Sequence, residues 1–388
     1  MSRIRKFRII VILVIYLVGC VNQTNEPTPT VPVYTKPTPI YSTPTKVILP
    51  TQALRTPFSV LTEPPVEGRL LFDFRARPPQ GGIHIINPDG SDLVQVVTKD
   101  ELDGGFPKWF PISEKIALVT RKMEGHFISR LVILDLVSDK KAMILPDTEV
   151  YNFSISPSDE KLAIAISTSR QFNIATVNSD GTDFQLLVYD GSADYNIQWS
   201  PDGMKIAYIG KDNTLFVINR DGSQKIAVAP GIHRNFSWSP NSDKIAFESS
   251  GGGSYDIYMA NLNEGEVYPI VSSPEIELDP VWSPQGNQII YESRSKPGWE
   301  FELRLLDLDR KENILVADFT QYKNVSIGNS KAVWSPDGNY LAIAVSHDDK
   351  PLHIYFYRID GIETSEMKEL LITNDHNFVI DWLDWRIP

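Results

Sequence analysis

The sequence is poor in the residues that bind metals and form disulfides. Its only cysteine is Cys20, so no disulfide can form within the chain, and it has six scattered histidines. No Cys/His spacing resembles a zinc site, and no HExxH or EF-hand motif is present. The sequence therefore predicts neither a metal nor another cofactor, and a fold stabilised by packing alone.

Positive charge is also scarce. The chain has 37 Lys and Arg residues against 49 Asp and Glu residues, which gives a net charge of −12 at pH 7. A protein that binds nucleic acid displaces counterions from phosphates with basic side chains, so an acidic chain is a poor candidate. The 42% of hydrophobic residues suffices for a sizeable core. We expect a globular protein with no nucleic-acid partner.

A serine-hydrolase motif is absent as well. The nucleophile of α/β-hydrolases lies in a Gly-x-Ser-x-Gly turn, and the nearest run here, Gly251 to Tyr255, lacks the closing glycine. No catalytic residue is therefore assigned from the sequence.

The N-terminus has the pattern of a secretory signal peptide. Four basic residues precede an apolar run from Ile9 to Gly19, which is too short to span about 30 Å of hydrocarbon. The run ends in Leu17-Val18-Gly19-Cys20, which resembles the bacterial lipoprotein box. This resemblance implies that residues 1–19 are removed and that Cys20 is acylated. Because two acyl chains hold a protein stably on a bilayer, the resemblance implies an extracytoplasmic protein anchored to the cell membrane. In a host that has two membranes, the anchor would be in the outer membrane.

A proline- and threonine-rich segment follows the cysteine. Ten prolines and ten threonines occur among the 47 residues from Val21 to Glu67. Proline favours extended conformations of about 3.1 Å per residue, and such a composition cannot bury a core. We expect residues 20–67 to form a semi-rigid stalk between the lipid and a folded domain.

From Gly68 onward the sequence repeats. One motif recurs six times at spacings of 46, 44, 39, 44 and 52 residues, and Trp385 provides a seventh, altered version. Each of the six is followed by a tight turn and apolar strands, about four strands in ~45 residues, which is typical of a propeller blade. The six versions are Trp109-Phe110-Pro111, Ile155-Ser156-Pro157, Trp199-Ser200-Pro201, Trp238-Ser239-Pro240, Trp282-Ser283-Pro284 and Trp334-Ser335-Pro336.

The two ends of the repeat region complement each other. Residues Gly68 to Thr98 supply three strands without the motif, whereas Phe378 to Trp385 supplies a motif strand with no sheet after it. Pairing them would complete one blade and remove open sheet edges. The prediction is an all-β, seven-bladed propeller of four-stranded antiparallel blades over residues 68–388, closed by the C-terminal strand.

The repeat, with its Trp-Ser-Pro-Asp-Gly motif, a following Lys-Ile-Ala and an Asn-x-Asp-Gly turn, is similar to that of TolB-type propellers. It covers about 320 residues of the chain. The resemblance implies the fold but not an activity, because such propellers serve as periplasmic scaffolds, peptidase gates and sugar-lyase frames. The chain departs from TolB itself in two expected features: no α/β domain precedes the propeller, and there are seven blades where TolB has six.

Candidate binding residues lie on the face where loops join neighbouring blades, because such loops commonly carry function. His233 and His376 each come just before a predicted innermost strand. Side chains at such positions could reach the channel. Glu277 and Asp279 belong to an acidic set of loops between blades. Arg294, Lys296 and Trp299 lie in a predicted loop between the second and third strands of one blade, and exposed tryptophan near arginine is typical of a binding hot spot.

These features support three hypotheses. The leading one is a lipid-anchored propeller that binds a protein or a glycan through its loop face without catalysis. The first alternative is an enzyme of the polysaccharide-lyase or hydrolase kind, with acidic residues and histidines converging in the channel. The second is a structural subunit of a cell-envelope complex.

Overall fold

The structure is a computed structural model that describes most of the chain after the stalk. The described residues are 67–75, 81–98, 104–123, 127–168, 171–189, 196–250, 254–295, 301–320, 332–347, 350–360, 363–371 and 379–386. The predicted signal peptide, Cys20 and all of the stalk except Glu67 lie outside this set, as do Lys296, Trp299 and His376. Within the described ranges, no helix is long and apolar enough to cross a membrane.

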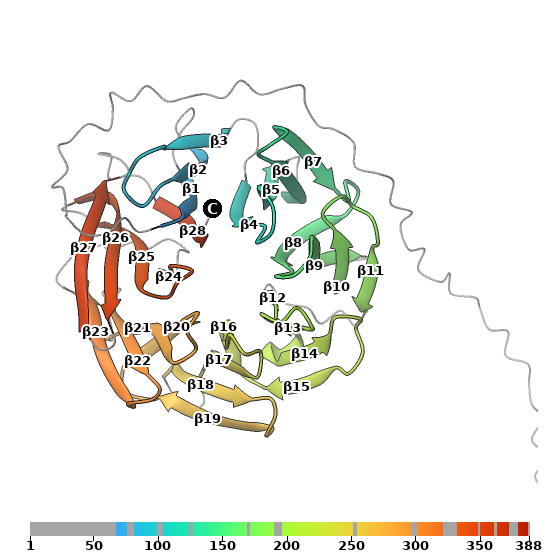
Figure 1. The fold of residues 1–388 in the computed structure, drawn as a ribbon. Helices are drawn as coiled ribbons and strands as arrows, with labels where there is room; N and C mark the ends of the chain where they lie inside the picture. The colour runs from blue at the N-terminus through green and yellow to red at the C-terminus, as the bar shows by residue number, and fades with distance from the viewer. Residues whose placement is uncertain are drawn as a thin grey trace, which may run out of the picture. The chain divides into compact units, whose positions relative to one another are not determined.

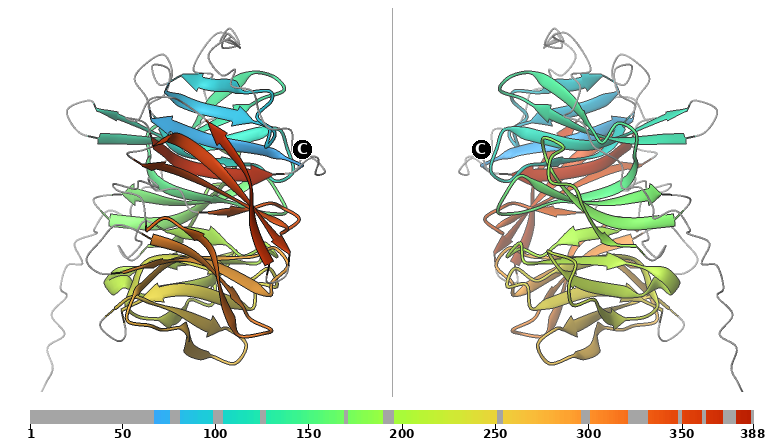
Figure 2. Two further views of the ribbon diagram at one scale, coloured as in Figure 1. Left: turned by 90° about the vertical axis from the view of Figure 1, so that its left-hand side faces the viewer. Right: turned by 90° about the vertical axis from the view of Figure 1, so that its right-hand side faces the viewer.

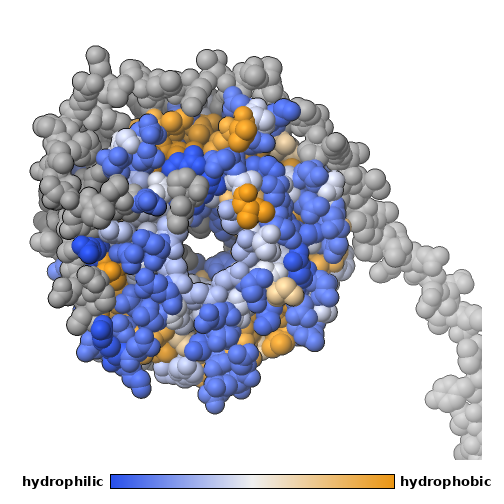
Figure 3. Space-filling model, viewed as in Figure 1, coloured by the Kyte–Doolittle hydropathy of each residue, from blue (hydrophilic) through white to orange (hydrophobic). Residues whose placement is uncertain are grey.

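The described residues form seven four-stranded antiparallel sheets arranged as blades around a ring (Figure 1). The side views show the blades stacked face to face around the ring (Figure 2), and a central opening is visible in the space-filling view (Figure 3). The predicted all-β, seven-bladed propeller is therefore confirmed.

The blades, numbered in chain order, are listed with each strand order running from the inner strand outward. Blade 1 contains β28 (Val379–Arg386), β1 (Arg69–Arg75), β2 (Gly82–Ile86) and β3 (Val94–Thr98); blade 2, β4 (Gly104–Trp109), β5 (Lys115–Met123), β6 (Phe127–Asp135) and β7 (Lys140–Ile144); blade 3, β8 (Glu149–Ile155), β9 (Lys161–Thr168), β10 (Gln171–Asn178) and β11 (Gln185–Val188); blade 4, β12 (Ile197–Trp199), β13 (Lys205–Ile209), β14 (Leu215–Asn219) and β15 (Ile226–Ala229).

Blade 5 contains β16 (Ile232–Trp238), β17 (Lys244–Ser249), β18 (Asp256–Asn261) and β19 (Glu266–Val271); blade 6, β20 (Ile276–Trp282), β21 (Gln288–Arg294), β22 (Phe301–Asp307) and β23 (Glu312–Asp318); blade 7, β24 (Val333–Trp334), β25 (Tyr340–His347), β26 (Lys350–Asp360) and β27 (Glu363–Leu371). A short 3-10 turn, η2 (Lys211–Asn213), joins β13 to β14.

The ring closes as the sequence predicts. β28 pairs antiparallel with β1, with Leu70 opposite Trp385 and Phe72 opposite Leu383. Trp385 packs edge-on against Phe356 of blade 7, with ring centroids 5.8 Å apart. The last strand of the chain therefore joins the first blade to the last.

The repeated motif folds through local hydrogen bonds made by its serine. Ser200 Oγ donates to Asp202 Oδ1 at 2.6 Å and accepts from the Lys205 amide at 2.9 Å, while Gly203 adopts a φ of +69° that favours glycine. Ser335 repeats both bonds with Asp337 and Tyr340. The motif is a hydrogen-bonded turn that starts the second strand of a blade, which explains its recurrence.

Replacing the motif serine should cost stability. Ser200 is fully buried, so Ser200→Ala leaves the Lys205 amide without its side-chain acceptor, and we expect a loss of about 1–3 kcal/mol in the free energy of unfolding. Urea denaturation measures the change. Ser223→Ala is the matched control, because Ser223 donates to Asp221 Oδ1 at 2.6 Å in an exposed turn. Equal effects at the two positions would contradict the role assigned to the motif.

The core lies between neighbouring blades rather than at the centre of the ring. One cluster joins Leu215 and Val217 of blade 4 to Phe236, Trp238 and Phe247 of blade 5, and equivalent clusters lie between the other blades, as between β5–β6 and β8–β9. Because each blade buries its two faces against its neighbours, side chains near the inner strands are held in place from both sides.

Candidate functional site

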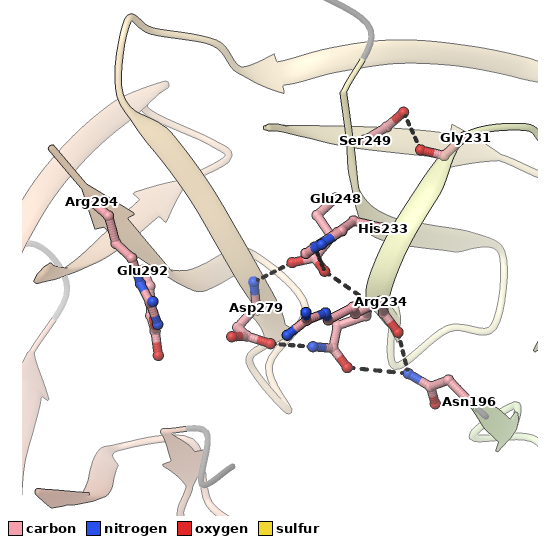
Figure 4. A network of polar contacts seen from close by, with 10 residues as sticks. Asn196, Gly231, His233, Arg234, Glu248, Ser249, Asp279, Glu292 and Arg294 are labelled. Carbon is pink, nitrogen blue, oxygen red and sulfur yellow. Dashed lines mark hydrogen bonds and ion pairs between the residues drawn. The ribbon is translucent and has the colours of Figure 1, made fainter. Parts of the chain in front are cut away.

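Three buried or half-buried carboxylates meet where blades 5 and 6 adjoin. Glu248 lies on β17, Asp279 on the inner strand β20 and Glu292 on β21. Glu248 Oε2 accepts a hydrogen bond from the Asp279 amide at 2.9 Å, and burial together with the negative charges of Asp279 and Glu248 raises the pKa of Glu292. We call these three residues the acidic cluster (Figure 4).

Glu248 joins the inner strands of the two blades. Its side chain is 1% exposed. Its Oε1 atom accepts a hydrogen bond from the Asn235 amide at 3.1 Å and lies 3.2 Å from His233 Nδ1, while its Oε2 atom accepts from the Asp279 amide at 2.9 Å. A buried carboxylate with both oxygens hydrogen-bonded is fixed in position, so Glu248 acts as a brace between β16 and β20.

Irregular pairing in both inner strands makes this brace possible. The register shifts between Ile232 and Phe236 in β16, and between Leu278 and Val281 in β20. Asp279 has a φ of +55°, which frees its amide for Glu248, and its Oδ1 atom accepts a hydrogen bond from Asn235 Nδ2. β-Bulges often redirect side chains near functional sites, and these two bring groups from neighbouring blades together.

Glu292 is paired with an arginine but remains poorly solvated. Arg294, two residues along β21, donates to Glu292 Oε2 from Nη2 at 2.6 Å and from Nε at 3.2 Å. The pKa of Glu292 is raised to about 7, chiefly by burial and further by the negative charges of Asp279 and Glu248, although Arg294 opposes the shift. Near neutral pH the cluster therefore changes charge.

The raised pKa predicts a pH-dependent stability that Glu292→Gln removes. The Glu292 carboxyl has a pKa of about 7 in the folded state and 4.5 in the unfolded state, so the folded state binds its proton more tightly. This tighter binding stabilises the fold fully below pH 4.5, and the contribution is lost as the pH rises through about 7. The shift corresponds to about 3 kcal/mol, so near pH 8 we expect Glu292→Gln to be about 2–3 kcal/mol more stable than the wild type, and near pH 4 equally stable.

Urea denaturation between those pH values measures this effect. Glu302→Gln is the matched control, because Glu302 is a part-exposed carboxyl that accepts from Arg304 Nε at 2.7 Å, and we expect it to change stability by less than about 1 kcal/mol. A pH profile for Glu292→Gln that parallels the wild type would contradict the assignment.

The structure corrects the placement of several candidate residues. Glu277 and Asp279 were expected in a loop between blades, yet both lie within β20, and His233 lies within β16 rather than before it. Arg294 is the last residue of β21, not part of the following loop. β16 and β20 each contain a bulge near the start of the strand, and β21 continues to Arg294. These strands therefore include residues whose composition is typical of loops.

The fold brings His233, Asp279 and Arg294 into one neighbourhood with two residues that the sequence analysis missed. Glu248 and Glu292 are 44 residues apart and follow the motif tryptophan at the same distance in blades 5 and 6. A charged residue repeated at an otherwise apolar strand position was the signal that could have identified them. His376, Lys296 and Trp299 lie outside the described residues and stay predictions.

Among the residues that the structure describes, no group of three or more His, Cys, Asp or Glu side chains is arranged to hold a metal ion.

Comparison with known proteins identifies the repeat type. No family model matches the chain. The Tol-Pal system protein TolB of Alcanivorax borkumensis is 31% identical over 97 residues, which make up 24% of this chain and only 20% of that relative. The crystal structure of TolB from Acinetobacter baumannii matches with a TM-score of 0.50 and 16% identity, covering 81% of this chain and 67% of TolB.

An enzyme shares the fold as well. An oligogalacturonate lyase solved in complex with manganese matches with a TM-score of 0.58 and 13% identity, over 72% of this chain and 83% of the lyase. At such identities the two structural matches establish the fold alone. Together with the local sequence match, they identify the repeats as TolB-like.

Proposed function

For this seven-bladed propeller of TolB-like repeats, we propose a non-catalytic binding function directed at a partner protein with a basic surface. The observation that carries the proposal is the acidic cluster, where carboxylates from two blades are held close together. Asp279 is half-buried, so the negative charge of the cluster is not wholly enclosed by the protein. Fixed charges in a low-dielectric setting attract an oppositely charged partner and set its orientation.

The hydrogen bonds of the cluster favour binding over catalysis. A general acid or base must come within hydrogen-bond reach of its substrate, but both oxygens of Glu248 already accept bonds from the protein itself, and Arg294 engages Glu292. An oligogalacturonate substrate would also be polyanionic, and the charge of the cluster would repel it. The lyase alternative therefore has less support.

The proposal includes the location. The charged and apolar N-terminal residues and the lipoprotein-like sequence ending at Cys20 support an extracytoplasmic protein tethered to membrane lipid by that cysteine. The proline- and threonine-rich segment 20–67 would then separate the propeller, residues 68–388, from the bilayer. Such an arrangement suits a protein that binds partners within the cell envelope.

Fluorescence anisotropy on the full-length protein in detergent tests the proposal. The probes are a short labelled Lys-Gly peptide, its Gln-Gly counterpart and a labelled oligogalacturonate. We expect only the Lys-Gly peptide to bind. Raising the salt from about 0.01 M to about 1 M shortens the Debye length from about 30 Å to about 3 Å, so the affinity for this peptide should fall at least about tenfold. Glu292→Gln should weaken the binding of the Lys-Gly peptide further than Glu264→Gln, a change at an exposed residue in the turn after β18.

Two other outcomes would redirect the assignment. Equal binding of the Lys-Gly and Gln-Gly peptides would contradict a charge-based function. Cleavage of oligogalacturonate, followed by absorbance of the unsaturated product with and without added Mn²⁺, would support the lyase alternative instead.

A further inference from the structure

A second acidic feature lies on the outer side of the acidic cluster, between blades 5 and 6. The connection from β19 to β20 and the strands β21, β22 and β23 line a solvent-open cavity of about 550 Å³. Cavities of this size commonly hold a side chain or a small ligand. Its polar lining includes Ser273, Glu275, Glu277, Tyr291, Glu302 and Arg304.

Glu277 is the unusual member of this lining. The residue is 1% exposed, its amide donates to the Tyr255 carbonyl at 2.8 Å, and its Oε1 atom accepts from the Ser273 hydroxyl. Its Oε2 atom is buried and accepts no hydrogen bond from an N–H or hydroxyl donor of the described residues, while the Asp256 carboxyl shares a hydrogen bond with the Glu277 carboxyl. A buried carboxylate oxygen without a donor is costly, which makes it a strong acceptor for any donor that enters.

The cavity also carries negative charge that its walls do not balance. Burial and the neighbouring carboxylates Asp256 and Glu275 raise the pKa of Glu277. The cation in the wall, Arg304, donates to Glu302 at 2.7 Å and is thereby engaged. Tyr291 donates its hydroxyl to Asn313 Oδ1 at 3.0 Å. The group that best satisfies this site is therefore a cation with N–H donors.

We propose that this cavity binds the cationic side chain of a lysine or arginine from a partner protein, with the ammonium or guanidinium donating to Glu277 Oε2. The inference rests on the proposed function and names the anchor through which a basic partner is held. A charge-assisted hydrogen bond inside a cavity is shorter and stronger than one between neutral groups. The serine hydroxyls of the lining suit the remaining donors of the cation.

Calorimetric titration of the full-length protein with single-residue probes tests this inference. The probe is Nα-acetyl-lysine methylamide, and the neutral control is the norleucine counterpart, which has the same length without the charge. We expect saturable binding of the lysine probe only. Glu277→Gln should weaken it about tenfold to a hundredfold, whereas the matched change Glu266→Gln, at an exposed residue of β19, should leave it unchanged.

A second variant keeps the test informative if Glu277→Gln fails to fold. Ser293 lies directly opposite Glu277 in the β20–β21 register, is 8% exposed and lines the cavity. Residues opposite one another project to the same face of a sheet, so Ser293→Lys should place an ammonium beside Glu277. We expect it to abolish binding of the lysine probe and to melt at a higher temperature than Ser293→Met, which fills the same space without charge.

The outcomes separate this inference from the proposed function. Equal binding of the lysine and norleucine probes, no saturable binding of the lysine probe, or full binding by Glu277→Gln would overturn the inference. The last result is expected if Glu277 instead shares a proton with Asp256. If the Lys-Gly peptide still binds with unchanged affinity to Glu277→Gln, the proposed function stands without this anchor. If the lysine probe binds through Glu277 but the peptide does not bind, the proposed function fails.

Discussion

Ending the chain at Asn377, and so removing β28, is expected to abolish cooperative folding of the propeller. The truncation leaves the inner edge of β1 unpaired along its whole length and removes Leu383 and Trp385 from a core cluster that includes Leu70, Phe72 and Phe356. Burial of one large apolar side chain contributes about 1.5–3 kcal/mol. Together with the exposed strand edge, the loss should approach the whole stability of a domain, about 5–15 kcal/mol.

β28 also makes polar contacts that reach a third blade. Asp384 accepts from the Trp109 amide of blade 2 at 3.0 Å. Arg386 pairs with Glu114, donates to the Ser113 carbonyl at 2.8 Å and lies over the Trp109 ring at 4.3 Å. The strand therefore connects blades 7, 1 and 2, which is why its removal should affect the whole ring.

Circular dichroism during thermal and urea unfolding measures the effect of this truncation. A chain ending at Arg386 keeps β28 and serves as the control, with an unfolding transition expected to match that of the full chain. A cooperative transition at the wild-type midpoint in the protein ending at Asn377 would show that the ring does not depend on its closing strand.

Glu248→Ala is expected to destabilise the propeller by about 2–5 kcal/mol, because it removes a buried carboxylate that is the acceptor of two part-buried amides. The Asn235 and Asp279 amides both donate to Glu248, and each lies at a bulge that leaves it outside the regular ladder. Glu248→Gln should cost less, since it keeps the shape and one acceptor oxygen. Urea denaturation measures the free energy of unfolding of both variants and of the wild type, and so shows which variant loses more stability.

Glu248→Ala should also change the titration of Glu292. The negative charge of Glu248 contributes to the raised pKa of Glu292, so its removal should move the pH-dependent loss of stability to lower pH. Glu264→Ala, an exposed carboxylate in the turn after β18, is the control and should leave both properties unchanged. A Glu248→Ala protein as stable as the wild type would contradict the brace between blades 5 and 6.

Much of the fold could be predicted because its information is local. In the two repeats that carry the complete motif, the serine, aspartate and glycine lie within five residues of one another, and their hydrogen bonds form a turn whatever the rest of the chain does. Counting the corresponding turns of all six motifs yields six of the seven blades. The closing strand could be predicted in the same way, because the N-terminal end of the repeat region has three strands where a blade needs four, and the C-terminal end has one additional strand.

The candidate site depended on contacts that no local pattern encodes. Glu248 and Asp279 are 31 residues apart and belong to different blades, so only blade packing brings them together. The bulge in β20 matters as much: in a regular strand Glu277 and Asp279 would share one face and one environment. Instead Glu277 lines the cavity beside Ser273, while Asp279 bonds to Glu248 and Asn235. The repeat in the sequence was enough to establish the blades and their number, because turn chemistry acts over a few residues. The grouping of the carboxylates arose only on folding, because it depends on how neighbouring blades pack and on a single irregularity in one strand.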